Sequence, residues 1–223
     1  MLPARPSLFY RTFFRYWLPA EMHRKLHGLY LLDGSTTTLP QQTPILLTPN
    51  HSSWWDGFIA LWLAEQYFGR TFRVLMREDQ LRRNAFLRGL GAFGIRPESP
   101  ASIRAALNYM NELLLDPNML LVVFPQGKIR PQMVQEWELR PGLTRLSAPN
   151  AVVVPAYFHQ EALNNPRPTQ FIRLGQPQPL AAVRKQPPVL SETLEHLRLE
   201  TRHALEQQQY GTRLFGRPIE PIV

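Results

Sequence analysis

A histidine and an aspartate five positions apart, His51 and Asp56, are the residues of this sequence best suited to proton-transfer chemistry. A histidine side chain titrates near neutral pH, so it can accept a proton from a substrate hydroxyl. A carboxylate at the start of a helix is favoured by the unpaired backbone N–H groups there. If the turn folds back, Asp56 reaches the far ring nitrogen of His51, fixes its tautomer and stabilises the imidazolium. We therefore expect His51 to be a general base that Asp56 orients and that activates a hydroxyl of the substrate.

A second polar stretch contains Gln126, Lys128 and Arg130, and it follows an apolar run at residues 120–124. The histidine stretch also follows an apolar run, at residues 45–47. Both runs predict buried strands, and open α/β sheets bind ligands at the carboxyl ends of their strands. Lys128 and Arg130 are suited to an anionic headgroup or to the phosphates of a donor. The alternatives are surface charge for the two cations and a structural role for the histidine.

Together the two stretches resemble the glycerolipid acyltransferase superfamily, the 1-acylglycerol-3-phosphate acyltransferases and their relatives. That family has an Asn-His-(four residues)-Asp motif, which matches in full at Asn50, His51 and Asp56. Its Phe-Pro-Glu-Gly motif, which basic residues follow, lies some seventy residues later. This second motif matches at three of its four positions, and Gln126 replaces the glutamate.

Two weaker motifs follow the family order. The third is an arginine near a Gly-x-Phe strand, and Arg96 stands one position early for it. The fourth is a hydrophobic strand with a central proline, which fits residues 153–156. Its Pro155 indicates an edge strand or a bulge, because proline cannot donate to a strand ladder. The resemblance spans roughly residues 40–160, and four ordered motifs are more specific than any one alone.

The resemblance implies transfer of a fatty acyl group from a coenzyme A or acyl-carrier-protein thioester to a lipid hydroxyl. His51 and Asp56 are the catalytic residues that it implies, and it implies neither a metal nor a bound cofactor. Backbone N–H groups near Gly127 or in the Ser52–Ser53 turn are candidates for stabilising the developing oxyanion. The candidate substrate-binding residues are Asn50, Arg96, Phe124, Pro125, Gln126, Gly127, Lys128 and Arg130.

The acceptor that we favour is a lysophospholipid such as 1-acylglycerol-3-phosphate. Gln126 keeps the hydrogen-bonding ability of the family glutamate but loses its charge, and Arg96 is displaced. Both departures concern acceptor recognition, so a glycolipid or a carotenoid glycoside is an alternative acceptor. A non-catalytic peripheral membrane-binding protein is the alternative from another class, and the intact His51 and Asp56 disfavour it.

These residues must be positioned by strands and helices. Apolar runs alternate with helical stretches along the chain, and this pattern predicts an α/β domain. We expect a mostly parallel or mixed sheet flanked by helices. The expected strands lie near residues 29–32, 45–47, 72–76, 91–95, 120–124, 152–158 and 171–174, and the expected helices near 6–25, 58–67, 84–90, 100–114 and 190–208. Residues 1–28 are predicted to contain an amphipathic membrane-interface helix, and residues 29–223 to form the acyltransferase domain.

Residues 6–25 are rich in aromatic and basic side chains. On a helix, Arg11 and Arg15 lie opposite a face about 160° wide that carries the aromatic rings. The rings on this face are those of Phe9, Tyr10, Phe13, Phe14, Tyr16 and Trp17. This pattern is typical of an interfacial helix, with rings at headgroup depth and arginines on lipid phosphates. Packing of the aromatic face on the domain is the alternative.

Composition narrows the class of partner. The 223-residue chain has a formal net charge of +8, which implies an anionic partner such as a membrane surface. Its basic residues are spread along the chain, which disfavours nucleic acid. It has no cysteine, which suits a reducing compartment, and no run of about 18 apolar residues. We therefore expect a cytoplasmic, peripheral membrane protein whose partners are membrane lipids and acyl-CoA or acyl-carrier protein.

Overall fold

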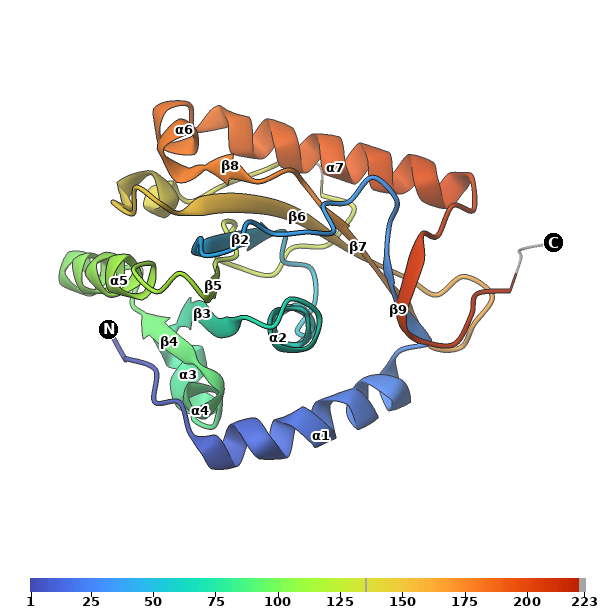
Figure 1. The fold of residues 1–223 in the computed structure, drawn as a ribbon, viewed down its shortest axis with the longest axis horizontal. Helices are drawn as coiled ribbons and strands as arrows, with labels where there is room; N and C mark the ends of the chain where they lie inside the picture. Colours follow the sequence, from blue (N-terminus) through green and yellow to red (C-terminus); the bar gives the residue numbers. More distant parts are fainter. Residues whose placement is uncertain (135, 221–223) are drawn as a thin grey trace.

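A mixed β-sheet forms the centre of the molecule (Figure 1). The computed structural model describes residues 1–134 and 136–220, so residues 221–223 of the predicted domain lie outside the described residues. The strands are β1 (Gly28–Leu31), β2 (Ile45–Pro49), β3 (Thr71–Arg77), β4 (Ala92–Ile95), β5 (Met119–Val122), β6 (Val152–Glu161), β7 (Thr169–Leu174), β8 (Gln178–Pro179) and β9 (Thr212–Gly216). Their order in the sheet is β4-β3-β5-β2-β6-β7-β1-β9, and β8 pairs with β6.

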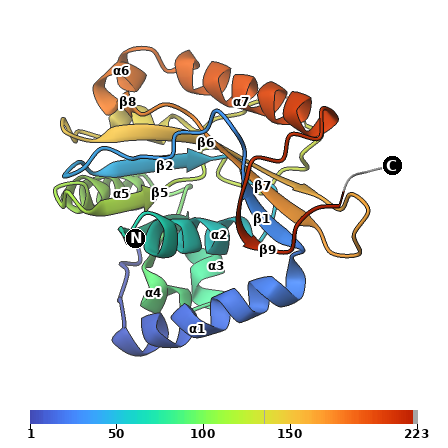
Figure 2. The same ribbon diagram turned by 45° about the vertical axis from the view of Figure 1, so that its right-hand side comes forward.

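Helices cover both faces of this sheet. In Figure 1, α6 and α7 lie along the top of the molecule and α1 along the bottom, and Figure 2 shows the same layers from another side. The helical segments are α1 (Leu8–Lys25), α2 (Asp56–Trp62), the π-helical η1 (Leu63–Tyr67), α3 (Glu78–Arg83), α4 (Leu87–Leu90), α5 (Pro100–Leu113), the 3₁₀-helical η2 (Pro141–Arg145), α6 (Leu180–Lys185) and α7 (Pro188–Glu206). The fold is the single α/β domain with a mixed sheet that the sequence predicts.

Alternate side chains of the central strands enter two separate cores. Ile45 and Leu47 of β2 pack in a cluster with residues of α1 and α2, whereas Leu46 packs with residues of α5, α6 and α7. The neighbouring strand β5 alternates in the same way, with Leu120 in the first core and Leu121 in the second. Successive side chains of a strand point to opposite faces, and here both faces are covered. This explains why β5 is apolar at every position and β2 at every position except Thr48.

The strands that lead into the two polar stretches run side by side in the same direction. β2 pairs in parallel with β5 on one side and with β6 on the other. The carboxyl ends of β2 and β5 therefore meet at one edge of the sheet. After β2 the chain enters α2 over the first core, whereas after β5 it passes Leu143 and Leu146 in the second core. Such a reversal in direction is where open α/β sheets form ligand-binding crevices.

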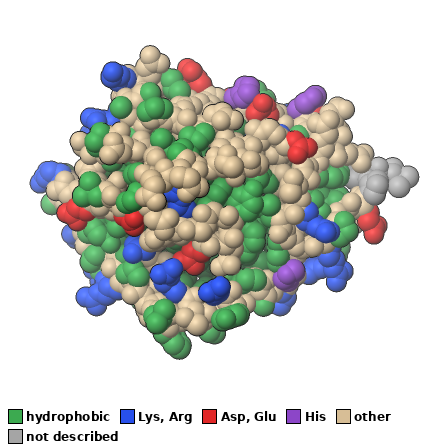
Figure 3. Space-filling view, viewed as in Figure 1, with side chains coloured by type: hydrophobic (Ala, Val, Ile, Leu, Met, Phe, Trp, Pro, Cys, Tyr) green, Lys and Arg blue, Asp and Glu red, His purple; other side chains and the backbone are tan. Residues whose placement is uncertain are grey.

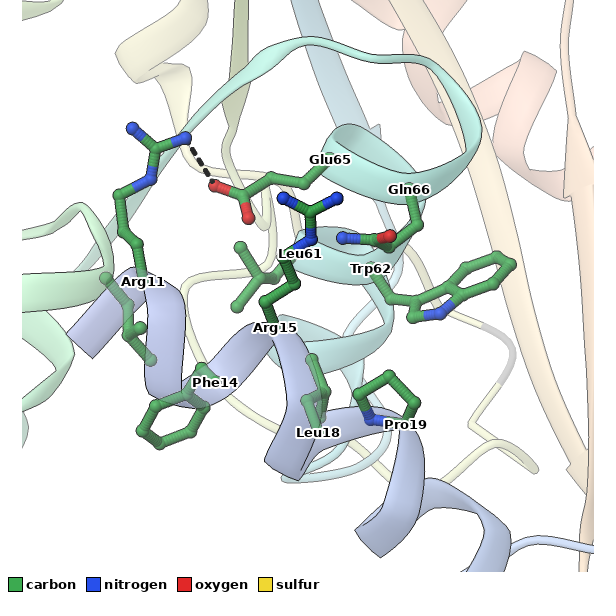
Figure 4. A pocket seen from close by; sticks show the side chains of 10 residues that line it. Arg11, Phe14, Arg15, Leu18, Pro19, Leu61, Trp62, Glu65 and Gln66 are labelled. Carbon is green, nitrogen blue, oxygen red and sulfur yellow. Dashed lines mark ion pairs between the residues drawn. The ribbon is translucent and has the colours of Figure 1, made fainter. Parts of the chain in front are cut away.

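The N-terminal helix α1 packs on the domain through one side. Its Phe14, Leu18 and Met22 are buried in the first core, and Phe14 stacks on Phe58 of α2 with ring centroids 6.2 Å apart. Figure 4 shows Arg11 beside Glu65 of η1, and these two side chains form an ion pair at 3.3 Å. Burial raises the pKa of Glu65, and the Arg11 guanidinium opposes that shift.

The aromatic face predicted for α1 is split in the structure, because Phe14 packs on the domain while other rings stay exposed, and its contact with a membrane stays a prediction. Arg11 and Arg15, which lie opposite the aromatic face, line the crevice between α1 and α2, and the rings divide between the core and the solvent. Phe9, Phe13 and Tyr16 are 72%, 50% and 73% exposed. Figure 3 shows hydrophobic side chains along the lower edge of the molecule, where α1 runs in Figure 1. No helix among the described residues is long and apolar enough to cross a membrane.

Candidate active site

The imidazole of His51 and the carboxylate of Asp56 form the pair that their spacing predicts. His51 Nδ1 lies 2.9 Å from Asp56 Oδ2. Because a carboxylate only accepts hydrogen bonds, Nδ1 carries the proton and Nε2 presents its lone pair. Nε2 has no hydrogen-bond partner in the described part of the chain, and the side chain is 19% exposed. His51 can therefore take a proton from the hydroxyl of a ligand.

The turn between β2 and α2 folds around the Asp56 carboxylate. Asp56 is the first residue of α2 and is fully buried. Its Oδ2 accepts hydrogen bonds from the backbone N–H groups of Ser52 at 2.7 Å and Ser53 at 2.8 Å, in addition to His51 Nδ1. Hydrogen bonds to an ionised acceptor are roughly twice as strong as neutral ones. The same carboxylate thus stabilises the turn and fixes the imidazole ring.

The side chain of Asn50 anchors the end of β2 to β6. Asn50 Nδ2 donates to the carbonyl of Phe158 at 3.0 Å, and the Phe158 N–H donates to Asn50 Oδ1 at 2.6 Å. The amide therefore extends the strand ladder by one step beyond the paired backbone of Pro49 and Ala156. Asn50 is buried, so this geometry assigns it to positioning the next residue, His51. Its predicted contact with substrate stays a prediction.

The second polar stretch braces the backbone of His51. Gln126 Oε1 accepts a hydrogen bond from the His51 N–H at 2.8 Å, and the Arg130 N–H donates to the His51 carbonyl at 2.8 Å. The Phe124 ring stacks on the imidazole, with ring centroids 4.1 Å apart. Gly127 donates to the Phe124 carbonyl and has a φ of 69°, a left-handed value that favours glycine. The two stretches found in the sequence therefore form one site.

The basic residues of this turn are already paired. Lys128 Nζ lies 3.9 Å from Glu138 Oε2, and the Arg130 guanidinium contacts the same carboxylate oxygen. Pro125 is buried, and its carbonyl accepts a hydrogen bond from the Arg140 N–H at 2.8 Å. The predicted cations thus lie beside the catalytic turn, and an anionic ligand would meet Glu138 there.

Arg96 lies apart from this cluster. It follows β4, which is three strands away from β2 in the sheet, and that is roughly 14 Å at the usual strand spacing. Its Nε lies 3.6 Å from Glu78 Oε2, and it lines a cavity of about 200 Å³ together with Arg77 and Arg82. The structure does not bring Arg96 into contact with the His51 turn, and its role in substrate binding stays a prediction.

Three of the amides predicted to stabilise the oxyanion are engaged elsewhere, and the other backbone N–H groups near Gly127 stay a prediction. The N–H groups of Ser52 and Ser53 donate to Asp56, and that of Gly127 donates to the carbonyl at residue 124. Gln126 Nε2 has no hydrogen-bond partner among the residues that the structure describes, so it is a donor left for a ligand.

Several residues that shape the site are missed by sequence reasoning. Gln132 Nε2 donates to Ser52 Oγ at 3.1 Å, Glu138 neutralises the two cations, and the backbone of Phe158 anchors Asn50. No motif or spacing marks these residues, because each contact joins loops or strands that are distant along the chain. The sequence shows only that Gln132 and Glu138 lie near the second motif.

Comparison with known proteins gives a family and a similar fold. A model of the Acyltransferase family matches residues 34–159, which include both polar stretches. The fold is similar to that of the 1-acyl-sn-glycerophosphate acyltransferase PlsC from Thermotoga maritima, with a TM-score of 0.56. The two sequences are 17% identical, and the similarity covers 86% of this chain and 83% of that chain. No curated protein matches this sequence.

Proposed function

The chain belongs to the acyltransferase family, and on that premise we propose that it transfers a fatty acyl group from an acyl thioester to a lipid hydroxyl. The donor is acyl-CoA or acyl-carrier protein, and the acceptor is a lysophospholipid such as 1-acylglycerol-3-phosphate. The observation that carries this proposal is the His51 imidazole, held by Asp56 through Nδ1 with Nε2 unengaged at the carboxyl ends of two parallel strands.

In the proposed reaction, His51 Nε2 takes the proton of the acceptor hydroxyl as its oxygen attacks the thioester carbonyl. Asp56 stabilises the imidazolium that forms. The tetrahedral intermediate then expels the thiolate, which takes the proton from the imidazolium, so the products are an ester and a free thiol. Gln126 Nε2 is a candidate donor to the carbonyl oxygen or to the acceptor.

Two observations bear on the acceptor. Lys128 and Arg130 lie beside the catalytic turn, where they can bind a phosphate, and the similar solved structure is of a 1-acyl-sn-glycerophosphate acyltransferase. The second candidate acceptor is a glycolipid or carotenoid glycoside. The neutral amide of Gln126 supports it, since an amide nitrogen can donate to a sugar oxygen.

Peripheral attachment to a membrane is part of the proposal. The exposed Phe9, Phe13 and Tyr16 of α1 are amphipathic or apolar rings of the kind that enter a lipid interface. Trp54, three residues after His51, is 55% exposed and packs on Phe58, which stacks in turn on α1. The exposed Phe13 contacts the buried Phe14, so aromatic side chains connect the outer side of α1 with the catalytic turn, which suits an acceptor that is held in a lipid layer.

The test of this function is acyl transfer by the purified protein. Labelled acyl-CoA or acyl-carrier protein would be offered with a panel of lysophospholipids, monoacylglycerol and glycosides. His51→Ala should lower turnover at least about a hundredfold, because general-base catalysis typically contributes 10²- to 10⁴-fold. His203→Ala, at an exposed histidine of α7, is the matched control and should keep full activity. Near-normal turnover by folded His51→Ala protein would reject the mechanism.

A further inference from the structure

Glu138 occupies the position that an anionic ligand of Lys128 and Arg130 would take. A single oxygen of its carboxylate, Oε2, lies 3.9 Å from Lys128 Nζ and also contacts the Arg130 guanidinium. The Glu138 side chain is 60% exposed, whereas that of Arg130 is 21% exposed. The carboxylate therefore lies on the solvent side of Arg130, and it can leave the two cations for water at low cost.

The loop holds Glu138 there from both sides. The indole of the preceding Trp137 donates through Nε1 to Glu195 of α7 at 2.9 Å and packs near Tyr157 of β6. On the other side, the Arg140 N–H donates to the Pro125 carbonyl of the second motif at 2.8 Å. Two anchored neighbours restrict where the intervening backbone can lie. The loop thus keeps the backbone of Glu138 beside the two cations, while its exposed side chain is free to rotate into water.

We propose that Glu138 is a specificity-determining residue that competes with the phosphate of a substrate for Lys128 and Arg130. This inference rests on the proposed function, in which these cations face the substrate. A phosphate offers several charged oxygens and can engage both cations at once, whereas Glu138 offers them one shared oxygen. Glu138 swings away when phosphate binds, and a neutral acceptor leaves it in place. The carboxylate thereby lowers the affinity for phosphate and reduces the preference for charged over neutral acceptors.

The backbone of Arg130 keeps its position when Glu138 is neutralised, because its N–H donates to the His51 carbonyl. The substitution Glu138→Gln also keeps an oxygen that can accept a hydrogen bond from the guanidinium. This variant should therefore fold and retain its catalytic turn. A purely structural role for Glu138 would predict no gain in phosphate binding from the same change.

The experiment compares wild-type protein, Glu138→Gln and the matched control Glu136→Gln. Glu136 is an exposed carboxylate two positions away that has no ion pair among the described residues. Equilibrium dialysis measures the Kd of labelled glycerol 3-phosphate, and acyl-transfer kinetics measure the KM of lysophosphatidate and of neutral monoacylglycerol at saturating thioester.

We expect Glu138→Gln to lower the Kd of glycerol 3-phosphate and the KM of lysophosphatidate by about 1.5- to fivefold, the range of a single exposed ion pair. The KM of monoacylglycerol should not change, and Glu136→Gln should match wild type throughout. A Kd in Glu138→Gln no lower than in wild type or in Glu136→Gln overturns the inference. If the Kd falls as expected but no variant transfers acyl groups, the inference stands and the proposed function fails.

Discussion

One oxygen of the Asp56 carboxylate accepts all three hydrogen bonds that reach this side chain, and the other oxygen is buried with no partner among the described residues. In Asp56→Asn, the remaining carbonyl oxygen can still accept from the two serine amides, so the turn should form. The negative charge that stabilises the imidazolium of His51 is lost, and the new amide nitrogen is buried without an acceptor.

We expect Asp56→Asn to lower kcat by about 10²-fold or more and the free energy of unfolding by about 1–3 kcal/mol. Steady-state kinetics and urea unfolding measure the two effects separately. Acceptor KM should change little, because Asp56 acts through His51 and is fully buried. A folded variant with wild-type kcat would show that the carboxylate has no part in the chemistry.

The sequence predicts the contact of His51 with Asp56 because both residues lie in one turn. The sequence does not predict the brace from Gln126, which joins positions 75 residues apart, and it assigns this amide to the substrate alone. Asn50 is a similar case, because its amide is engaged by the backbone of Phe158, 108 positions away. A residue type limits which bonds are possible, and the tertiary fold selects among them.

At the scale of elements, α1 has a core side and an exposed aromatic side, and this division changes how membrane binding must be tested. Deleting the helix would remove Phe14, Leu18 and Met22 from the first core, so a loss of binding could not be separated from unfolding. Substitution of the exposed rings avoids this problem.

We expect the triple substitution of Phe9, Phe13 and Tyr16 by serine to weaken sedimentation with anionic phospholipid vesicles at least about tenfold. Each ring should lose its interfacial burial, worth about 25 cal/mol per Å² of apolar surface. The control replaces Leu115 and Leu199 by serine. These residues are 78% and 49% exposed, and they lie just after α5 and in α7, away from α1. Equal vesicle binding by the triple variant and the control would mean that this side of α1 does not contact lipid.

The strand β6 is an element whose place in the sheet the proline rule does not predict. Pro155 predicts an edge or a bulge, but β6 lies in the interior of the sheet between β2 and β7. Before Pro155 the strand pairs with β8, at Val152 and Val153, and after it with β7 from Ala156 onwards. Pro155, which has no N–H, thus lies where the strand beside β6 changes from β8 to β7. Proline is tolerated there because no ladder bond is lost.

At the scale of the whole molecule, the ends of the chain complete the sheet together. The sequence predicts β1 but not its neighbour β9, which is short, half-exposed and antiparallel to it. The Tyr30 hydroxyl donates to the Arg217 carbonyl, and the Arg217 N–H donates to the carbonyl of His27. β9 forms because β1 would otherwise be an unpaired edge of the sheet. No pattern in the residues of β9 itself predicts a strand. The short α3 and α6 are missed for a similar reason, since neither has a long apolar periodicity.

Stability of the whole fold should depend on pH through His159 of β6. Burial lowers the pKa of His159, an effect that Glu161, 3.5 Å away, only partly offsets. Its Nδ1 is buried with no hydrogen-bond partner among the described residues. In the unfolded chain a histidine titrates near pH 6.5. As the pH falls below about 6.5, the unfolded chain takes up a proton that the native state resists, so the free energy of unfolding decreases.

His159→Gln should therefore reduce the loss of stability between pH 7.5 and pH 5.5, because the side chain that prefers to be neutral in the native state is gone. Urea unfolding of wild-type protein and variant at the two pH values measures this difference. His203→Gln, at the exposed histidine of α7, is the control and should keep the wild-type pH dependence. If His159→Gln loses as much stability as wild type over this interval, another group governs the acid sensitivity of the fold.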